Sequence, residues 1–201
     1  MTSKDDRSAD GRRLAKVLRH RGDLEHDIEG WFPVDTVLAE LRWDCERLEQ
    51  EVARNTRYQL SQDGRTVRAL HGHSFPVEYE SAQPPDTLFH GTSSAGLEAI
   101  QDSGSILPMG RHMVHLSDDP DKAIGVGRRH GEAIALVIDA SRMHREGFRF
   151  YRSADGVYLV GSVPLEFVVD QIERRRACNK PLFERLSDLL AGSASSILAS
   201  D

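Results

Sequence analysis

The sequence predicts an α+β protein, with an N-terminal winged-helix lobe followed by a mixed α/β lobe. Apolar residues recur every three or four positions through residues 12–54, and after residue 56 the period changes to two. Residues 74–86 contain three prolines and no clear periodicity, which is typical of a connection between lobes. Beyond this segment, short strand-like and helix-like stretches alternate, as in a mixed lobe built around a sheet.

Three helices are predicted in residues 12–54. Their apolar faces are Leu14, Val17 and Leu18; Val37, Leu38 and Leu41; and Cys45, Leu48 and Val52. Ser8 or Asp10 is suited to cap the first helix, which ends at Arg19-His20, and Asp35 is suited to cap the second.

A hairpin follows the third helix. Residues 57–60 and 66–70 alternate in polarity and flank a turn that contains Asp63-Gly64. Three helices followed by a hairpin predict the winged-helix module. Alternation places Tyr58 and Leu60 on the core side of the first strand and Arg57 on the other side. Taken alone, Arg57 is one more solvated arginine.

The second half of the chain is predicted to contain a substantial sheet. Strands are expected at 87–90, 113–116 and 133–138, and residues 148–151 pair with 157–160 across a turn; short helices are expected near 97–104 and 121–129. An amphipathic helix is expected from Pro181 onwards. We therefore divide the chain into a winged-helix lobe (1–75), a linker (76–86), a mixed α/β lobe (87–170) and a C-terminal helical extension (171–201).

The composition excludes several function classes. A net charge of −6 argues against a protein that coats nucleic acid through its phosphates, so any RNA contact must use positive charge gathered in one pocket. Two cysteines and nine histidines without ligand spacing give no metal site. No apolar run approaches the ~20 residues of a membrane span, and the N-terminus lacks a signal-peptide core. A monomeric cytoplasmic protein without membrane contact is expected.

Arginine and histidine recur in short motifs that could carry chemistry. These are Arg19-His20, His71-Gly72-His73-Ser74, Leu88-Phe89-His90-Gly91-Thr92, residues 111–117 and Gly127-Arg128-Arg129-His130-Gly131. Each alone is weak, since a histidine at a strand end is more often structural. A dinucleotide loop at Gly125-Val126-Gly127 lacks its third glycine, and no Gly-x-Ser-x-Gly elbow is present. Converging guanidinium groups bind phosphate and stabilise added negative charge, and histidine transfers protons, which indicates phosphate chemistry.

Taken together, these motifs resemble one family, the Tpt1/KptA RNA 2′-phosphotransferases, from about Arg12 to Phe167. The motifs, in order, are Leu18-Arg19-His20, Gly30-Trp31, Val34-Asp35, Arg57-Tyr58, Arg68-Ala69, Gly72-His73-Ser74, Phe89-His90-Gly91-Thr92, Arg111-His112, Val114-His115-Leu116-Ser117, Gly127 with Arg129-His130-Gly131, Gly156-Val157-Tyr158-Leu159 and Val163-Pro164. The Leu-Arg-His, His-Gly-Thr and Val-His-Leu-Ser motifs in this order are specific to the family.

The resemblance implies that residues 1–75 are a winged-helix RNA-binding lobe and that residues 87–170 are an NAD-binding, ADP-ribosyltransferase-like lobe. It also implies a reaction in two steps. The 2′-phosphate of an RNA attacks the nicotinamide ribose of NAD⁺ and expels nicotinamide, which gives an ADP-ribosylated RNA phosphate. The ribose 2″-hydroxyl then attacks the phosphorus and releases 2′-OH RNA and ADP-ribose 1″,2″-cyclic phosphate. NAD is consumed as a co-substrate, the RNA partner bears a 2′-phosphate, and no metal is needed.

The resemblance also assigns residues. The family's catalytic set maps onto Arg19, His20, Arg57 and Arg111, with the arginines on the phosphate and His20 assisting proton transfer. The NAD site maps onto His90, Gly91, Thr92, His115, Leu116, Ser117, Gly127, Arg129, His130, Gly131 and Val157. His112 and His130 have an equally good structural interpretation. Val157 stands where related transferases often place a glutamate.

Some segments depart from the family, and other functions stay open. Residues 21–29 carry an acidic cluster in place of the usual proline-containing stretch, and the segment before Arg57 is shortened, which puts RNA preference in doubt. One alternative is an ADP-ribosyltransferase that caps terminal phosphates of nucleic acids. Another is a non-catalytic sensor of ADP-ribose or RNA, which retention of all four catalytic positions disfavours.

Overall fold

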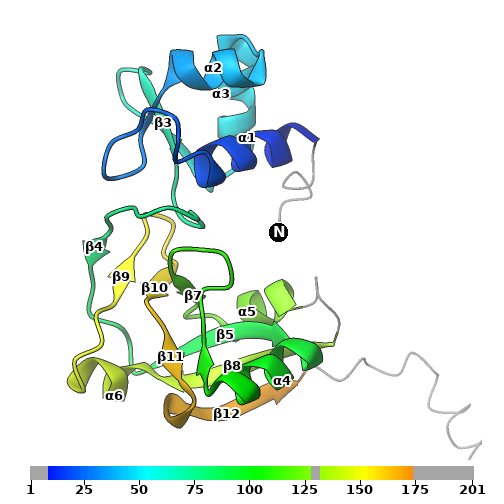
Figure 1. Cartoon of the computed structure of the whole chain (residues 1–201), viewed down its shortest axis with the longest axis vertical. Helices are drawn as coiled ribbons and strands as arrows, with labels where there is room; N and C mark the ends of the chain where they lie inside the picture. Colours follow the sequence, from blue (N-terminus) through cyan, green and yellow to red (C-terminus); the bar gives the residue numbers. More distant parts are fainter. Residues whose placement is uncertain (1–8, 128–131, 174–201) are drawn as a thin grey trace, which may run out of the picture.

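The computed structural model describes residues 9–127 and 132–173 of the chain. These residues form two lobes, one above the other in Figure 1, each with its own hydrophobic core. The first core contains Leu14, Leu18, Phe32 and Leu48, and the second contains Leu88, Leu136, Ile138 and Phe150, all with at most 1% of their surface exposed. The predicted mixture of helices and strands is confirmed, whereas the substantial sheet expected in the second half is divided, within the described residues, into separate sheets of four, three and two strands.

The first lobe contains the three predicted helices. They are α1 (Ala9–His20), α2 (Val34–Leu41) and α3 (Cys45–Arg54). Asp44 caps α3 by accepting a hydrogen bond from the Arg47 N–H at 2.9 Å. The predicted cap Asp35 is wrong, because the cap position of α2 is Pro33, two residues earlier, and Asp35 lies within the first turn.

A three-stranded antiparallel sheet completes the first lobe. Its strands are β1 (Phe32–Pro33), β2 (Tyr58–Leu60) and β3 (Thr66–Ala69), in the order β1-β3-β2. The β2–β3 hairpin was predicted, whereas β1 is too short to show a period. Tyr58 is buried and its hydroxyl donates to the carbonyl of Gly11 at 3.1 Å, so the hairpin closes onto α1.

The segment between the lobes contributes a strand of its own. β4 (Glu80–Ser81) pairs with β9 (Tyr151–Arg152), so the predicted linker is also the edge of a sheet. This sheet has the order β4-β9-β10-β7, with β10 (Tyr158–Val160) and β7 (Val114–Leu116). The predicted pairing across the turn at 153–156 is confirmed by β9 and β10.

A second antiparallel sheet has the order β12-β8-β5. β8 (Ala133–Asp139) is the central strand, as its apolar run predicted. β5 (Thr87–Ser93) runs three residues past the predicted end, because Gly91, Thr92 and Ser93 continue the pairing with β8. β12 (Val168–Glu173) continues beyond residue 170, where we placed the end of the second lobe. β6 (Ser105–Ile106) and β11 (Val163–Pro164) form a separate pair.

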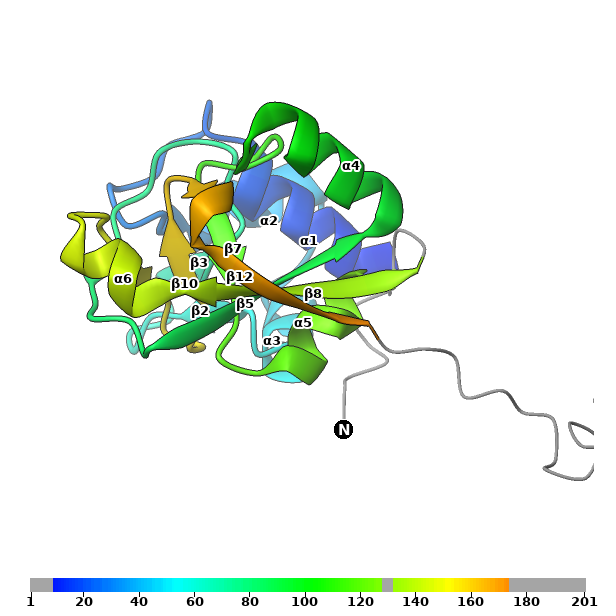
Figure 2. The ribbon, with the colours of Figure 1, turned by 90° about the horizontal axis from the view of Figure 1, so that it is seen from below.

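Helices cover the β12-β8-β5 sheet. Figure 2 shows the three strands side by side, with α4 (Ser94–Ser103) and α5 (Pro120–Gly127) on either side of them. The helix predicted near residues 97–104 ends at Gly104 as expected, in a left-handed conformation, and it is capped by Ser93, which was not predicted. The short α6 (Ala140–Arg145) and a 3₁₀ turn (Leu165–Phe167) were not predicted.

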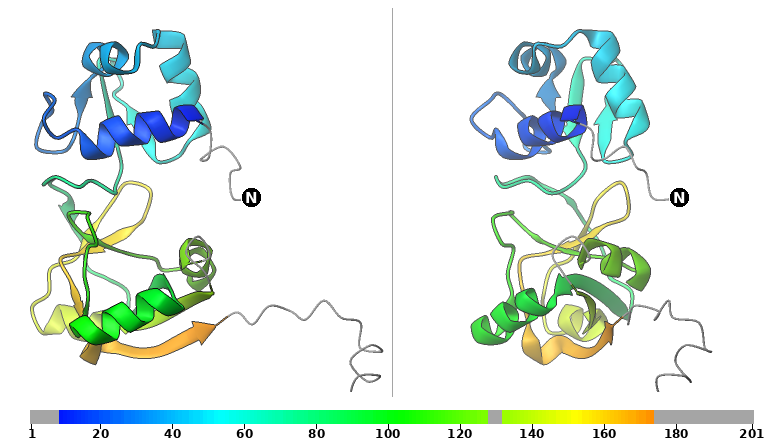
Figure 3. Two further views of the ribbon diagram at one scale, coloured as in Figure 1. Left: turned by 45° about the vertical axis from the view of Figure 1, so that its right-hand side comes forward. Right: turned by 90° about the vertical axis from the view of Figure 1, so that its right-hand side faces the viewer.

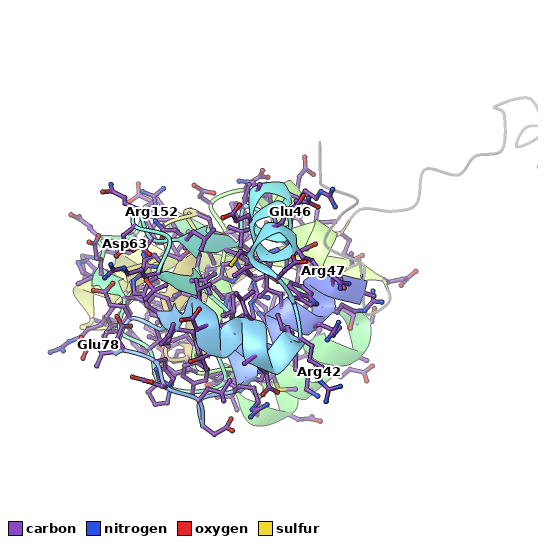
Figure 4. The ribbon with its side chains drawn as sticks, turned by 90° about the horizontal axis from the view of Figure 1, so that it is seen from above. Arg42, Glu46, Arg47, Asp63, Glu78 and Arg152 are labelled. Carbon is purple, nitrogen blue, oxygen red and sulfur yellow. The ribbon has the colours of Figure 1, made fainter. Side chains whose placement is uncertain are left out.

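No helix in the described ranges is long and apolar enough to span a membrane. The helix predicted from Pro181 lies outside the described residues. Seen from above, the labelled side chains carry both signs: Arg42, Arg47 and Arg152 are basic, and Glu46, Asp63 and Glu78 are acidic (Figure 4).

Candidate site between the lobes

The chain segment that leaves β3 lies between the two lobes (Figure 3) and binds both of them. The N–H of Ser74 donates to the carbonyl of Arg19 at 2.9 Å, at the end of α1. The N–H of His112, in the loop before β7, donates to the carbonyl of His73 at 2.7 Å. The motif Gly72-His73-Ser74 therefore fixes the last turn of α1 against the second lobe.

The last two residues of α1 are Arg19 and His20. Arg19 is buried, and its guanidinium lies 5.9 Å from the centre of the Tyr58 ring. Gly72 has φ +92°, and a Cβ built on it would lie 3.3 Å from Arg19 Nε. This close contact of backbone and guanidinium explains the glycine, because a side chain would push Arg19 away. His20 is exposed, with Nδ1 3.1 Å from the Ser74 hydroxyl.

The second lobe brings Arg111 to this place. Arg111 is exposed and follows Met109 and Gly110, which both have left-handed backbone conformations with φ of 51° and 80°. Partial burial and the positive charges of Arg19 and Arg111 lower the pKa of His20. His20 is therefore neutral more often than a free histidine and can take up a proton beside an anion.

Arg57 approaches the same region from the hairpin. It is half-buried, while its neighbour Tyr58 is buried, as the predicted alternation requires. Burial raises the pKa of Tyr58, and the charges of Arg19 and Arg57 oppose this rise. Both arginines also act electrostatically on His71. The four residues assigned to catalysis thus come from both lobes and lie around the segment between them.

His90 on β5 and His115 on β7 form the adjoining part of the site. His90 Nδ1 lies 3.1 Å from the carbonyl oxygen of His115, and His115 Nδ1 lies 3.0 Å from that of Met113. A carbonyl only accepts, so each Nδ1 must carry the proton and each Nε2 presents a lone pair. His115 Nε2 is buried and has no hydrogen-bond partner among the described residues.

Both rings are neutral at physiological pH. Burial, followed by the charges of His71 and Arg111, lowers the pKa of His115 to about 2. Burial also lowers the pKa of His90, although its bond to the His115 carbonyl opposes this. A pair of neutral imidazoles with unprotonated Nε2 atoms can accept hydrogen bonds from hydroxyl groups and does not attract phosphate. We call Arg19, Arg57 and Arg111 the arginine cluster, and His90 and His115 the histidine pair. The two groups suit different parts of a ligand.

Two glycines of the predicted NAD site lie where α5 meets β5. A Cβ on Gly91 would lie 1.8 Å from the Ala123 carbonyl oxygen, and a Cβ on Gly127 would lie 2.2 Å from the Thr92 carbonyl oxygen. These distances are far below contact, so only glycine permits this approach of helix and strand. Thr92 is buried beneath the helix.

Among the other residues predicted for the NAD site, strand alternation decides which side chains face the site and which face the core. His115 and Ser117 share one face of β7, and the Ser117 hydroxyl accepts from the N–H of Asp119 at 3.0 Å. Leu116 points to the opposite face and is buried in the second core, so its side chain does not line the site. Val157 is half-buried just before β10. Arg129, His130 and Gly131 lie outside the described residues.

His73 is a buried histidine that we did not assign to the site. It is 2% exposed, and its Nδ1 lies 2.8 Å from the Tyr79 hydroxyl. Burial, with a smaller effect of Arg19, lowers the pKa of His73 to about 3. His71, whose Nε2 lies 3.2 Å from Asp155 Oδ2, is a second such histidine, which the sequence shows only as part of the His71-Gly72-His73-Ser74 motif. Periodicity gives no signal for either contact, because the partners are distant in the sequence.

Acid should destabilise the protein through His73. Unfolded, its pKa is near 6.5, whereas in the folded protein it is about 3, so only the unfolded chain takes up a proton between these values. Above pH 6.5 the protonation of His73 does not reduce the free energy of unfolding. Well below pH 6.5 it lowers this free energy by about 1.4 kcal/mol for each pH unit. Urea unfolding of wild type and His73→Gln from pH 7 to 5 tests this. We expect a flatter decline in the variant, and parallel declines would contradict the assignment.

The region between the lobes holds no evident metal site. No group of three or more His, Cys, Asp or Glu within 9–127 and 132–173 is arranged to hold a metal ion.

Comparison with known proteins identifies the family. The family model of the RNA 2′-phosphotransferases, Tpt1/KptA family, matches residues 5–162. A probable RNA 2′-phosphotransferase from Burkholderia lata is 41% identical over 178 residues, covering 82% of this chain and 91% of the relative. Proteins of the same description from Pseudomonas fluorescens and Acaryochloris marina are each 38% identical and cover 77% and 78% of this chain, and 92% and 93% of their own lengths.

A solved structure, protein CC0527 from Caulobacter crescentus, is 17% identical and covers 52% of this chain and 98% of that chain. Its TM-score of 0.35 is too low to carry an argument. The match to the family model and the identity to these relatives, over most of the chain, show that this protein belongs to the Tpt1/KptA family of RNA 2′-phosphotransferases.

Proposed function

We propose that this protein is an NAD⁺-dependent RNA 2′-phosphotransferase, which moves an internal 2′-phosphate from RNA onto ADP-ribose. The observation that carries the proposal is the meeting of Arg19, His20 and Arg111 beside the neutral pair His90 and His115. One group is suited to an anion and the other to sugar hydroxyls. In this proposal the first lobe acts as a winged-helix RNA lobe and the second as an ADP-ribosyltransferase-like lobe.

The histidine pair fits the ribose of NAD⁺. His115 Nε2 is a buried acceptor that lacks a partner among the described residues, and leaving such an atom unsatisfied costs about 1–3 kcal/mol. A ribose hydroxyl would satisfy it. NAD⁺, when bound, supplies an ADP-ribosyl group and a leaving group, nicotinamide. Its role here is that of a co-substrate.

The arginines fit the RNA 2′-phosphate. A guanidinium holds two phosphate oxygens at once and keeps its charge at all working pH values. Arg19 is held in place by Gly72 and Tyr58, so its position is fixed before the phosphate arrives. His20 is exposed at the same point, with a lowered pKa, and would move a proton to the departing RNA hydroxyl.

The acidic cluster at residues 21–29 does not oppose this arrangement strongly. Asp23 is paired with Arg21 at 2.8 Å, and Glu29 with Arg68 at 3.1 Å. Asp27 accepts the N–H groups of Glu29 and Trp31, each at 2.9 Å. Much of the negative charge is therefore offset locally.

Release of nicotinamide tests the proposal. Purified protein is incubated with NAD⁺ alone, with NAD⁺ and an RNA that bears one internal 2′-phosphate, or with NAD⁺ and an RNA that bears only a terminal phosphate. We expect stoichiometric nicotinamide release with the first RNA and little release in the other two. Release with the terminal phosphate alone, with a stable ADP-ribosylated end, would support the capping activity instead. NAD⁺ binding without release would support a sensor.

The acceptor role of His115 can be measured by NAD⁺ binding. His115→Leu removes the lone pair and puts an apolar side chain in place of the ring. We therefore expect the dissociation constant for NAD⁺ to rise about tenfold, the value of one hydrogen bond. His144→Leu, on the exposed side of α6, is the matched control and should bind like wild type. Calorimetric titration with NAD⁺ distinguishes them. Equal affinities for all three proteins would contradict the role of His115.

A further inference from the structure

We infer that Asp155 and His71 are a positioning pair that holds His115 in place. The pair joins the first lobe, which carries Arg19 and Arg57, to the proposed NAD⁺ site of the second lobe. His71 follows β3 of the first lobe, and Asp155 lies in the turn between β9 and β10 of the second lobe. His71 Nε2 lies 3.2 Å from Asp155 Oδ2. Their side chains are only 14% and 16% exposed, although the backbone of the turn is open to solvent.

The pair fixes the state of the His71 ring. Burial alone would raise the pKa of Asp155, but the hydrogen bonds from His71 and Ser153 outweigh it, so its pKa lies below the usual value and the carboxylate is ionised. An ionised carboxylate only accepts, so the proton of His71 lies on Nε2. Burial lowers the pKa of His71, so the ring carries a single proton, and Nδ1 is an unprotonated nitrogen, buried and without a hydrogen-bond partner among the described residues.

The His71 ring stands edge-on to the ring of His115. Their centres are 5.2 Å apart and their planes are inclined by 66°. His115 also bonds to the Met113 carbonyl through Nδ1, so this bond and the contact with His71 together limit how its ring can turn. Because His115 Nε2 is the acceptor assigned to NAD⁺, a shift of His71 would misplace that acceptor. The effect on NAD⁺ rests on the proposed function, whereas the contact between the rings does not.

His71 also lies beside the phosphate site. Arg19 and Arg57 act electrostatically on His71, and Arg19 and Arg111 act on His115. The chain of contacts from Asp155 through His71 to His115 therefore runs between the arginine cluster and the histidine pair. A connection at this place sets the distance between the two substrates, on which group transfer depends strongly.

The first lobe contains a second turn of the same construction, which separates the role of Asp155 in the turn from its role between the lobes. In Ser153-Ala154-Asp155-Gly156 the serine hydroxyl lies 2.6 Å from the aspartate, and Gly156 N–H donates to the Ser153 carbonyl at 2.9 Å. In Ser61-Gln62-Asp63-Gly64 the corresponding distances are 2.6 Å and 3.0 Å. The Asp63 side chain is 61% exposed, and Figure 4 places it at the edge of the first lobe.

Nuclear magnetic resonance of the histidine rings tests the inference without any substrate. Long-range ¹H–¹⁵N spectra should show the proton on Nε2 of His71 and on Nδ1 of His115. Asp155→Ala should shift the ring signals of both histidines, and the matched variant Asp63→Ala should shift neither. Unchanged His115 signals in Asp155→Ala, or equal shifts in both variants, would overturn the inference.

Kinetics with NAD⁺ provide the second measurement. Asp155→Ala should raise the KM for NAD⁺ about tenfold, as expected for one misplaced hydrogen bond, with a smaller change in kcat. Asp155→Asn keeps an oxygen that accepts from His71 Nε2 and should restore most of the affinity, whereas Asp63→Ala should match wild type. Failure of Asp155→Asn to restore affinity would overturn the role of the hydrogen bond. If wild type does not react with NAD⁺, the proposed function fails, and the ring spectra still decide whether the pair positions His115.

Discussion

Replacing Arg111 with alanine is expected to slow phosphate transfer by about 100-fold or more, the usual cost of losing one fixed group that stabilises developing negative charge. Arg111 is exposed and its charge reaches His20, His90 and His115, which makes it the arginine that the second lobe adds to the site. Arg111→Lys keeps the positive charge and loses the bidentate hydrogen bonding to phosphate, so it should recover only part of the rate. Single-turnover measurements with saturating NAD⁺ give the comparison.

The control for this variant is Arg65→Ala. Arg65 belongs to the hairpin turn of the first lobe, and its side chain is 85% exposed. We expect Arg65→Ala to react at the wild-type rate and both variants to melt at the wild-type temperature, because neither side chain is buried. A wild-type rate for Arg111→Ala would remove Arg111 from the phosphate site.

Replacing Gly91 with alanine is expected to destabilise the second lobe by about 3 kcal/mol, near the upper end of the usual cost of overpacking. The added Cβ would lie 1.8 Å from the Ala123 carbonyl oxygen, and backbone atoms on a helix packed against a strand cannot move aside cheaply. A loss of this size corresponds to a fall in melting temperature of roughly 10 °C. Thermal unfolding followed by circular dichroism measures it.

Gly125→Ala is the matched variant for Gly91→Ala. Gly125 lies on α5, the helix that Gly91 contacts, and a Cβ there would meet nothing within 4 Å. Alanine also favours the helix over glycine by up to about 1 kcal/mol, so this variant should be as stable as wild type or slightly more so. If both glycine variants lose stability equally, the close approach of β5 and α5 is not the cause.

The sequence predicted the longer elements of the fold because their periodicity extends over several turns or strand residues. Periodicity predicted the apolar faces of α1 and α3, the hairpin of β2 and β3 and the central position of β8. Four of the five two-residue strands among the described residues, β1, β4, β6 and β11, contain too few residues to show any period, whereas β9 could be predicted from the turn that joins it to β10. The misplaced cap of α2 has a similar cause, since Pro33 belongs to β1 and leads the chain into the helix directly.

The candidate site was predicted through motifs and not through physical pattern alone. Arg19 and His20 could be placed at the end of a helix, and Arg57 on the outer side of a strand, but nothing in their spacing brings them to Arg111. The contacts of His71 with Asp155 and of His73 with Tyr79 depend on how the two lobes pack. Leu116 was grouped with its neighbours in the motif, whereas strand alternation turns its side chain into the core.

The fate of the phosphorus tests the central claim most directly. An RNA that carries ³²P in one internal 2′-phosphate is incubated with the protein, with and without NAD⁺, and the labelled products are separated. The proposed function predicts that the label leaves the RNA only when NAD⁺ is present and that all of it appears in ADP-ribose 1″,2″-cyclic phosphate. Label released as inorganic phosphate, label lost without NAD⁺, or label retained in the RNA by folded protein that binds NAD⁺ would contradict it.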